Sequence, residues 1–144
     1  MSSFTAPLLI MAVPQGRSGG VNLCPPGAST QRWMIIGGFT YAVGSLEQPS
    51  EVIEVPDRFI FDGATVPVLL RAITPTVHPD YIQAAALHDW MLQSGRARAD
   101  CDAVFAEALQ VLNMPAPWRQ IMVAAVRLRS MQANILNKIR AIIK

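Results

Sequence analysis

The sequence predicts an α+β fold, with a small antiparallel sheet in the N-terminal half packed by three to four C-terminal helices. The first half contains short runs rich in β-branched and aromatic residues, separated by Gly and Pro clusters. The second half repeats apolar residues at intervals of three and four, as amphipathic helices do. Strands followed by helices along one chain are typical of the α+β class.

Four strands are expected, over residues 8–13, 33–43, 51–55 and 59–61. The second contains Gly37-Gly38, which indicates a bulge or a close approach of another backbone. The third alternates polar and apolar residues, so one of its faces should meet water.

The helices are expected over residues 80–92, 100–112, 118–130 and 133–143. Asn113, with Pro115 and Pro117, separates the second helix from the third. The last helix places apolar side chains on one stripe and basic residues opposite, and we expect this helix to bind a partner. The predicted contact residues are Ile135, Leu136, Ile139, Ile143, Lys138 and Arg140.

We divide the chain of 144 residues into three parts. Residues 1–32 form an N-terminal strand and a Gly/Pro-rich arm, residues 33–131 form a single α+β domain, and residues 132–144 form the C-terminal basic helix. No run approaches the ~20 apolar residues that span a bilayer, so no membrane span is expected.

The composition favours a protein that meets partners. Apolar residues make up 51% of the chain and charged residues only 15%, against about 25% charged in ordinary domains. After Asn113 there are six basic residues and no acid, whereas the rest holds six bases and ten acids. This split suggests docking on an acidic neighbour, nucleic acid or a membrane surface, or only a solvated basic face.

Neither cysteine belongs to a disulfide or zinc pattern. The apolar run at residues 6–13 lacks the basic flank of a secretory signal, and Pro14 interrupts it. We therefore expect synthesis in a cytoplasm, with reduced thiols.

Two short polar motifs are the candidate site. Asp62 opens an Asp-Gly-Ala-Thr-Val-Pro turn, and His88-Asp89 follow three alanines in a predicted helix. Buried polar groups require partners, so we expect these motifs to lie close together. Simple turn capping by Asp62 and a satisfied core histidine are the structural alternatives.

The next helix adds Asp102, on the buried stripe of Phe105 and Leu109, with Arg98 at the helix start and Arg127 as a further inward candidate. One interpretation is a buried network that braces the helices. The other is a metal site, because a histidine with carboxylates suits a divalent ion. Candidate ligands are His88, Asp89, Asp62 and Asp102, and candidate catalytic residues are His88, Asp89 and Asp62.

Known catalytic signatures are absent from the sequence. There is no HExxH, no Gly-rich phosphate loop and no Gly-x-Ser-x-Gly elbow. Metal-dependent phosphohydrolases with adjacent His-Asp need further ligands, and the other histidine, His78, is poorly spaced for that role. We therefore favour a non-enzymatic protein without a cofactor.

The same motifs resemble a known family. Asp-Gly-Ala-Thr-Val-Pro at 62–67 and Ala-Ala-Ala-Leu-His-Asp at 84–89, followed by Arg98, Asp102 and Arg127, look like the domain of unknown function 1353 family. That family is common in tailed phages and prophages, and the likeness covers about residues 39–129. Trp90-Met91 departs mildly from the family pattern. The resemblance implies no reaction, and it implies a shared polar set of Asp62, His88, Asp89, Arg98, Asp102 and Arg127.

Two functions follow as hypotheses. The favoured one is a structural component of a tailed-phage virion, in the tail or baseplate region, that binds other virion proteins in an oligomeric assembly. The alternative is a metal-dependent hydrolase acting on cell wall or nucleotide at the His-Asp site. Nucleic-acid binding is not expected, because no groove-reading motif accompanies the basic residues.

Overall fold

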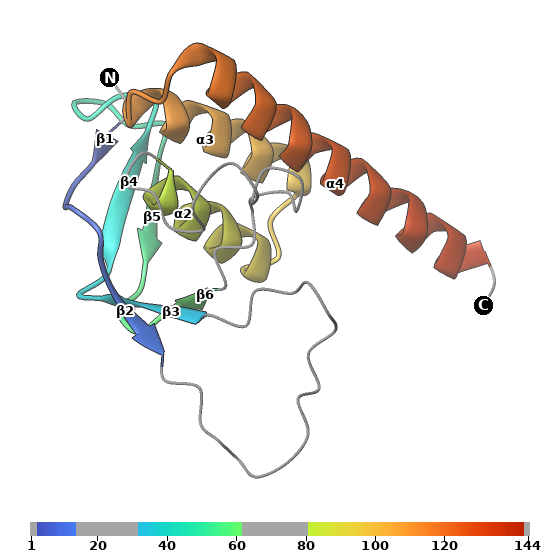
Figure 1. Ribbon diagram of the computed structural model, residues 1–144, viewed down its shortest axis with the longest axis horizontal. Coiled ribbons are helices and arrows are strands. Elements are labelled where there is room, and N and C mark those ends of the chain that lie inside the picture. Colours follow the sequence, from blue (N-terminus) through green and yellow to red (C-terminus); the bar gives the residue numbers. More distant parts are fainter. Residues whose placement is uncertain (1–2, 14–31, 62–80, 143–144) are drawn as a thin grey trace, which may run out of the picture.

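The computed structural model describes residues 3–13, 32–61 and 81–142. These residues form two small antiparallel sheets and three helices (Figure 1). The sheets come from the first part of the chain and the helices from the second. The predicted α+β class is therefore confirmed, with two sheets where one was expected.

Each sheet has three strands. The first has the order β1-β4-β5, formed by Ser3–Phe4, Phe39–Val43 and Glu51–Val55. The second has the order β2-β3-β6, formed by Leu9–Val13, Arg32–Ile36 and Ile60–Phe61. Residues 3–13, 32–43 and 51–61 each supply one strand to each sheet, and the middle stretch is central in both.

The single strand expected over residues 33–43 is divided at Gly37-Gly38. Both glycines have positive φ, 82° and 68°, which glycine adopts at no steric cost. A Cβ at Gly38 would lie 2.7 Å from the carbonyl oxygen of Val55. The Gly37 amide donates to Asp57 Oδ1 at 2.7 Å. The predicted close approach of another backbone is thus present. At Gly37-Gly38 the chain passes from β3 in the second sheet to β4 in the first.

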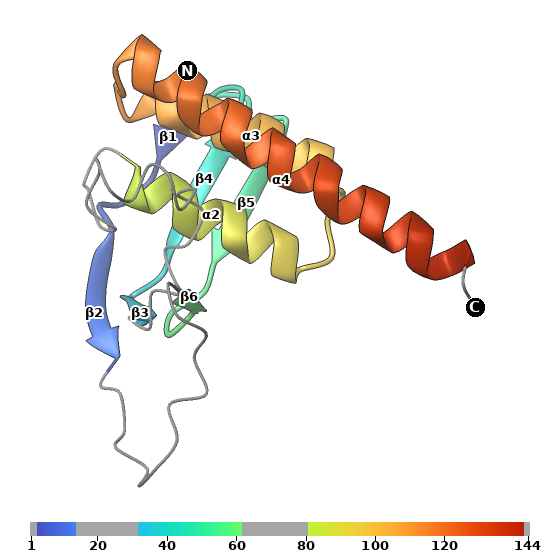
Figure 2. The ribbon, with the colours of Figure 1, turned by 45° about the vertical axis from the view of Figure 1, so that its right-hand side comes forward.

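The three helices are α2 (Ile82–Gln93), α3 (Arg98–Val111) and α4 (Ala116–Ile142). Every side chain of α2 from Ile82 to His88 is buried. Ala84, Ala85 and Ala86 are small enough to let neighbouring backbone approach α2 closely, so this helix occupies the centre of the molecule (Figures 1 and 2). Helix α3 contacts both α2 and α4.

Helix α3 ends where the sequence predicts. Asn113 has a positive φ of 57°, and the Met114 amide donates to the carbonyl of Leu109 at 3.1 Å. A left-handed Asn is a common way to close a helix. Pro115 then precedes the first turn of α4, where a proline is tolerated.

Residues 116–142 form one continuous helix, whereas two helices were expected over 118–130 and 133–143. No Gly or Pro lies between Ser130 and Ala133, so nothing ends the helix there. The C-terminal half of α4 extends beyond the rest of the molecule (Figures 1 and 2). None of the described helices combines the length and apolarity needed to cross a membrane.

The core joins the first sheet to α3. Tyr41 on β4 and Phe105 on α3 are fully buried. The Tyr41 hydroxyl donates to Glu107 Oε1 at 3.0 Å, and the Gly44 amide donates to the same oxygen at 3.2 Å. This carboxylate therefore links the end of β4 to α3. The second sheet and α2 instead contribute residues to the candidate site.

Candidate functional site

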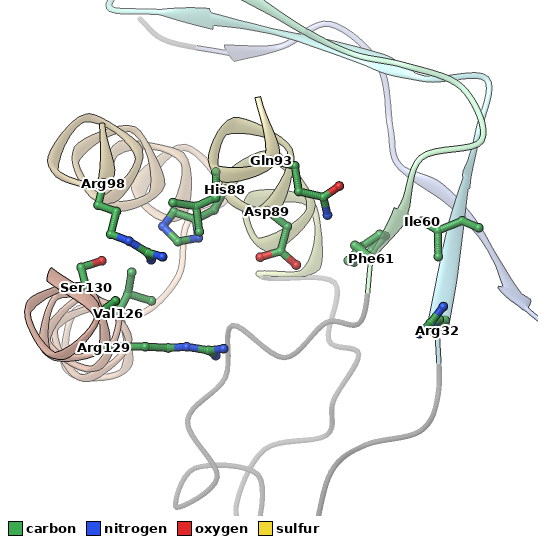
Figure 3. A pocket seen from close by; sticks show the side chains of 12 residues that line it. Arg32, Ile60, Phe61, His88, Asp89, Gln93, Arg98, Val126, Arg129 and Ser130 are labelled. Atoms are coloured by element: carbon green, nitrogen blue, oxygen red, sulfur yellow. The ribbon is translucent and has the colours of Figure 1, made fainter. Parts of the chain in front are cut away.

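A pocket of about 660 Å³ lies where α2, the start of α3, the middle of α4 and the end of the second sheet meet. Figure 3 shows side chains from all of these elements around it. The described residues that line it are Arg32, Ile60, Phe61, His88, Asp89, Leu92, Gln93, Arg98, Val126, Arg129, Ser130 and Ala133. Three of the four residues that the sequence pointed to on the first two helices, His88, Asp89 and Arg98, therefore share one pocket.

His88, which lines this pocket, forms a buried pair with Asp102. The distance from His88 Nε2 to Asp102 Oδ1 is 2.9 Å, and the two side chains are 5% and 7% exposed. Asp102 is buried on the same α3 face as Phe105 and Leu109, as its spacing predicted. The Phe105 ring lies 5.2 Å from the His88 ring, centroid to centroid. The imidazole is thus held on one edge by a carboxylate and on one face by an aromatic ring.

The other ring nitrogen of His88 is not paired within the described residues. Nδ1 is buried and has no hydrogen-bond partner there. A buried polar atom left without a partner costs about 1–3 kcal/mol, so such atoms are rare in native proteins. The unpaired Nδ1 belongs to a residue that lines the pocket, and in the neutral ring an unprotonated Nδ1 is a hydrogen-bond acceptor.

The neutral form of His88 is favoured at neutral pH. Burial lowers the pKa of His88 from its usual value of 6.5, because charging the ring inside the protein is costly. Asp102 opposes this shift, and the guanidinium groups of Arg98 and Arg129 add to it. A carboxylate only accepts hydrogen bonds, so the single ring proton belongs on Nε2 and the lone pair on Nδ1.

Three arginines give the pocket a positive character. Arg32 comes from β3, Arg98 from the start of α3 and Arg129 from α4 (Figure 3). Asp89 is the one carboxylate among the described lining residues. Guanidinium groups bind phosphate and carboxylate through paired hydrogen bonds. The arrangement is suited to an anionic ligand.

Sequence reasoning missed two of these arginines. Arg129 follows Val126 by three residues and so lies on the same side of the helix. Arg127 was expected to face inward, and this was wrong: both arginines are exposed, but only Arg129 lines the pocket. The spacing from Val126 was the available signal. Arg32 lies outside the stretch, about residues 39–129, that resembles the family, and nothing in its local sequence indicated a site.

Several predicted residues have other positions. Asp62 and its turn lie outside the described residues, as does Ile143, so their expected contacts stay predictions. The predicted partner-binding residues of α4 are exposed: Ile135, Leu136, Ile139, Lys138 and Arg140.

Cys101 is buried beside Asp102, and burial raises the pKa of its thiol. A raised thiol pKa makes this cysteine a poor nucleophile.

The described residues do not gather three or more His, Cys, Asp or Glu side chains in a way that could hold a metal ion. Asp102 is bonded to His88 Nε2 through Oδ1 and, unlike Asp89, is not among the described residues that line the pocket. Of the four proposed ligands, His88 through Nδ1 and Asp89 are the described ones that line the pocket. A metal site there would need Asp62 or another ligand in addition.

Fold and site together define a small α+β domain with an arginine-lined pocket around a buried His-Asp pair. A family model for proteins of unknown function, DUF1353, matches residues 33–126. The chain belongs to this family. No curated protein and no solved structure matched the chain.

Proposed function

We propose that this protein is a structural component of a tailed-phage virion, in the tail or baseplate region, and that it binds its neighbours through α4. The phage setting is suggested by the family resemblance described above. The assembly role is supported by one observation, an exposed apolar seam along α4.

The seam consists of Ile121, Leu128, Ile135 and Ile142, which follow one another at intervals of seven residues. Their exposed fractions lie between 43% and 82%. Met131 and Ile139 lie between them and are also exposed. Apolar residues repeated every seven positions form the contact face of a helix that packs along another helix. A seam of this length is therefore suited to a helical partner.

The opposite face of α4 is already covered. Met122, Val126 and Ser130 are the buried residues of this helix, and they lie about half a turn from the seam. Beyond Ala133 the described side chains are all exposed, and this part projects from the molecule (Figure 2). Exposed apolar patches of this kind mark interaction surfaces, so we assign the seam to a partner rather than to the chain's own core.

Charge selects the kind of partner. The described part of α4 carries five basic residues and no acid: Arg119, Arg127, Arg129, Lys138 and Arg140. A second copy would bring the same positive charges to a symmetric contact, and like charges repel. We therefore propose a neighbouring virion protein that presents an apolar helix or groove with acidic flanks.

Quantitative mass spectrometry of purified virions tests the setting. The protein should be present at a fixed copy number, and its absence from particles would overturn the proposal. Particle assembly should fail with Ile135→Glu, which places a charge in the seam. Asn137→Glu adds the same charge at an exposed position of α4 off the seam, and should assemble normally. Equal assembly of both variants would exclude the seam.

A metal-dependent hydrolase is the second candidate, favoured by the unpaired His88 Nδ1 beside Asp89 in the pocket. Metal analysis of the purified protein tests it, with His88→Ala and Asp89→Ala as variants. Stoichiometric metal that both variants lose while they remain folded supports this candidate. Full metal occupancy in both variants would contradict a metal site built on His88 and Asp89.

A further inference from the structure

We propose that His88 is the general base of a hydrolytic site and that the arginine-lined pocket takes a phosphate ester as its substrate. This inference goes beyond the assembly role and does not depend on the α4 seam. It assigns a proton transfer to a named atom and a substrate class to the pocket.

The first argument is the orientation of the imidazole. Asp102 holds His88 through Nε2 at 2.9 Å, and Phe105 packs against the ring. A carboxylate that orients a histidine and holds its proton on the far nitrogen is the arrangement of a general base. The ring is buried, so its direction is set by packing rather than by solvent. The pair leaves Nδ1 as the nitrogen with a lone pair.

The second argument is that Nδ1 has no structural task within the described residues. His88 is 4% exposed, and Nδ1 lacks a hydrogen-bond partner there. A brace between α2 and α3 needs only the bond from Nε2 to Asp102. It does not account for a second nitrogen that is kept unpaired in a residue of the pocket wall (Figure 3). A base that receives a proton from a bound molecule does account for it.

The third argument is the charge around that nitrogen. Arg32, Arg98 and Arg129 reach the pocket from three separate elements, and Figure 3 shows Arg98 and Arg129 on the side of His88 that faces α4. The non-bridging oxygens of a phosphate ester gain negative charge as water attacks, and guanidinium groups stabilise that charge. The Ser130 hydroxyl adds one further donor to the pocket wall.

The reaction balances without any additional reactant. Water oxygen forms a bond to phosphorus while His88 Nδ1 takes a proton from that water. The bond from phosphorus to the leaving alkoxide breaks, and the imidazolium returns its proton to the alkoxide. One water is consumed, and a phosphate with one ester bond fewer and an alcohol are released.

Hydrolysis of three chromogenic esters by the full chain tests the proposal: bis-p-nitrophenyl phosphate, p-nitrophenyl phosphate and the neutral p-nitrophenyl acetate. At least one phosphate ester should be turned over faster than the acetate. His88→Gln should lower kcat by about 100-fold or more while the circular dichroism spectrum is unchanged. No turnover of either phosphate ester, or equal turnover by His88→Gln, would overturn the proposal.

Two arginine variants keep the test decisive if His88→Gln does not fold. Arg129 and Arg127 are both exposed on α4, but only Arg129 lines the pocket. Arg129→Gln should raise KM for the phosphate ester about tenfold or more, and Arg127→Gln should leave it unchanged. Equal KM values for the two variants would overturn the assignment. Ile135→Glu, the assembly variant, should retain full hydrolysis, so a failure of either proposal is recognised separately.

Discussion

The outer face of α4 and the pocket beside α2 depart from the usual distribution of residues in opposite directions. On α4, large apolar side chains such as Ile135 and Ile142 are exposed, although apolar burial drives folding. In the pocket, His88 Nδ1 is buried and unpaired within the described residues, although buried polar atoms are nearly always paired. Departures from the folding rules concentrate at functional positions, so the comparison indicates two separate functional surfaces.

One helix connects the two regions. Val126 and Arg129 of α4 line the pocket, and Leu128, between them in sequence, belongs to the exposed seam. Residues one position apart on a helix point about 100° apart. The same turns of α4 therefore serve the pocket on one side and a partner on the other, and substitutions can separate the two.

The largest expected effect comes from the buried side of the comparison. Phe105 is fully buried and packs on the His88 ring. Phe105→Ala should lower the free energy of unfolding by about 3–5 kcal/mol, because it leaves a cavity under the imidazole. Urea denaturation measures this loss. Leu128→Ala on the seam is the control and should change stability by no more than about 0.5 kcal/mol. Similar losses for both would show that the seam is packed in the free protein.

Acid should lower the stability of the folded protein through His88, on the buried side of the comparison. The pKa of His88 is lowered by folding from its usual 6.5, so the unfolded chain binds the proton more readily. Stability is therefore full above about pH 6.5 and falls as the pH drops below that value. Urea denaturation near pH 7.5 and near pH 5.5 checks this in the wild type and in His88→Gln. Asp102, Asp89, Arg98 and Arg129, which lie around the ring or line the same pocket, are present in both proteins. An equal loss in the variant would assign the acid effect to groups other than His88.

The smallest expected effect belongs to the seam itself. Ile139 is 46% exposed on the projecting part of α4. Ile139→Ser should change the free energy of unfolding of the isolated protein by no more than about 0.5 kcal/mol. Thermal or urea denaturation is sufficient to measure it. A loss of about 2 kcal/mol or more would mean that Ile139 packs against its own chain, and the seam would then be shorter than we infer.

Local sequence patterns predicted many of the elements because each has a local cause. The alternation at residues 51–55 matches β5, and the apolar spacing with Asn113 predicted α3 and its end. The strand at Ser3–Phe4 was missed because two residues carry no detectable period. The division of residues 33–43 between two sheets depends on Val55 and Asp57 from another strand, which no local pattern reports.

The candidate site was predicted in part for the same reason. The position of Asp102 on a buried helical stripe, and the burial of His88 after three alanines, follow from helical spacing. Arg32, which joins His88 and Asp89 in the pocket, was not predicted because its chain segment meets α2 only in the folded protein.

The sequence by itself determined the α+β class, the order of its elements and the polar residues worth following, since these depend on periodicity and composition over short stretches. Only the tertiary structure decided that Asp102 holds His88 by Nε2, that Arg129 rather than Arg127 meets the pocket, and that the apolar seam of α4 is left uncovered by the rest of the chain. These outcomes depend on which faces of distant segments pack together, and that packing is set by the whole core.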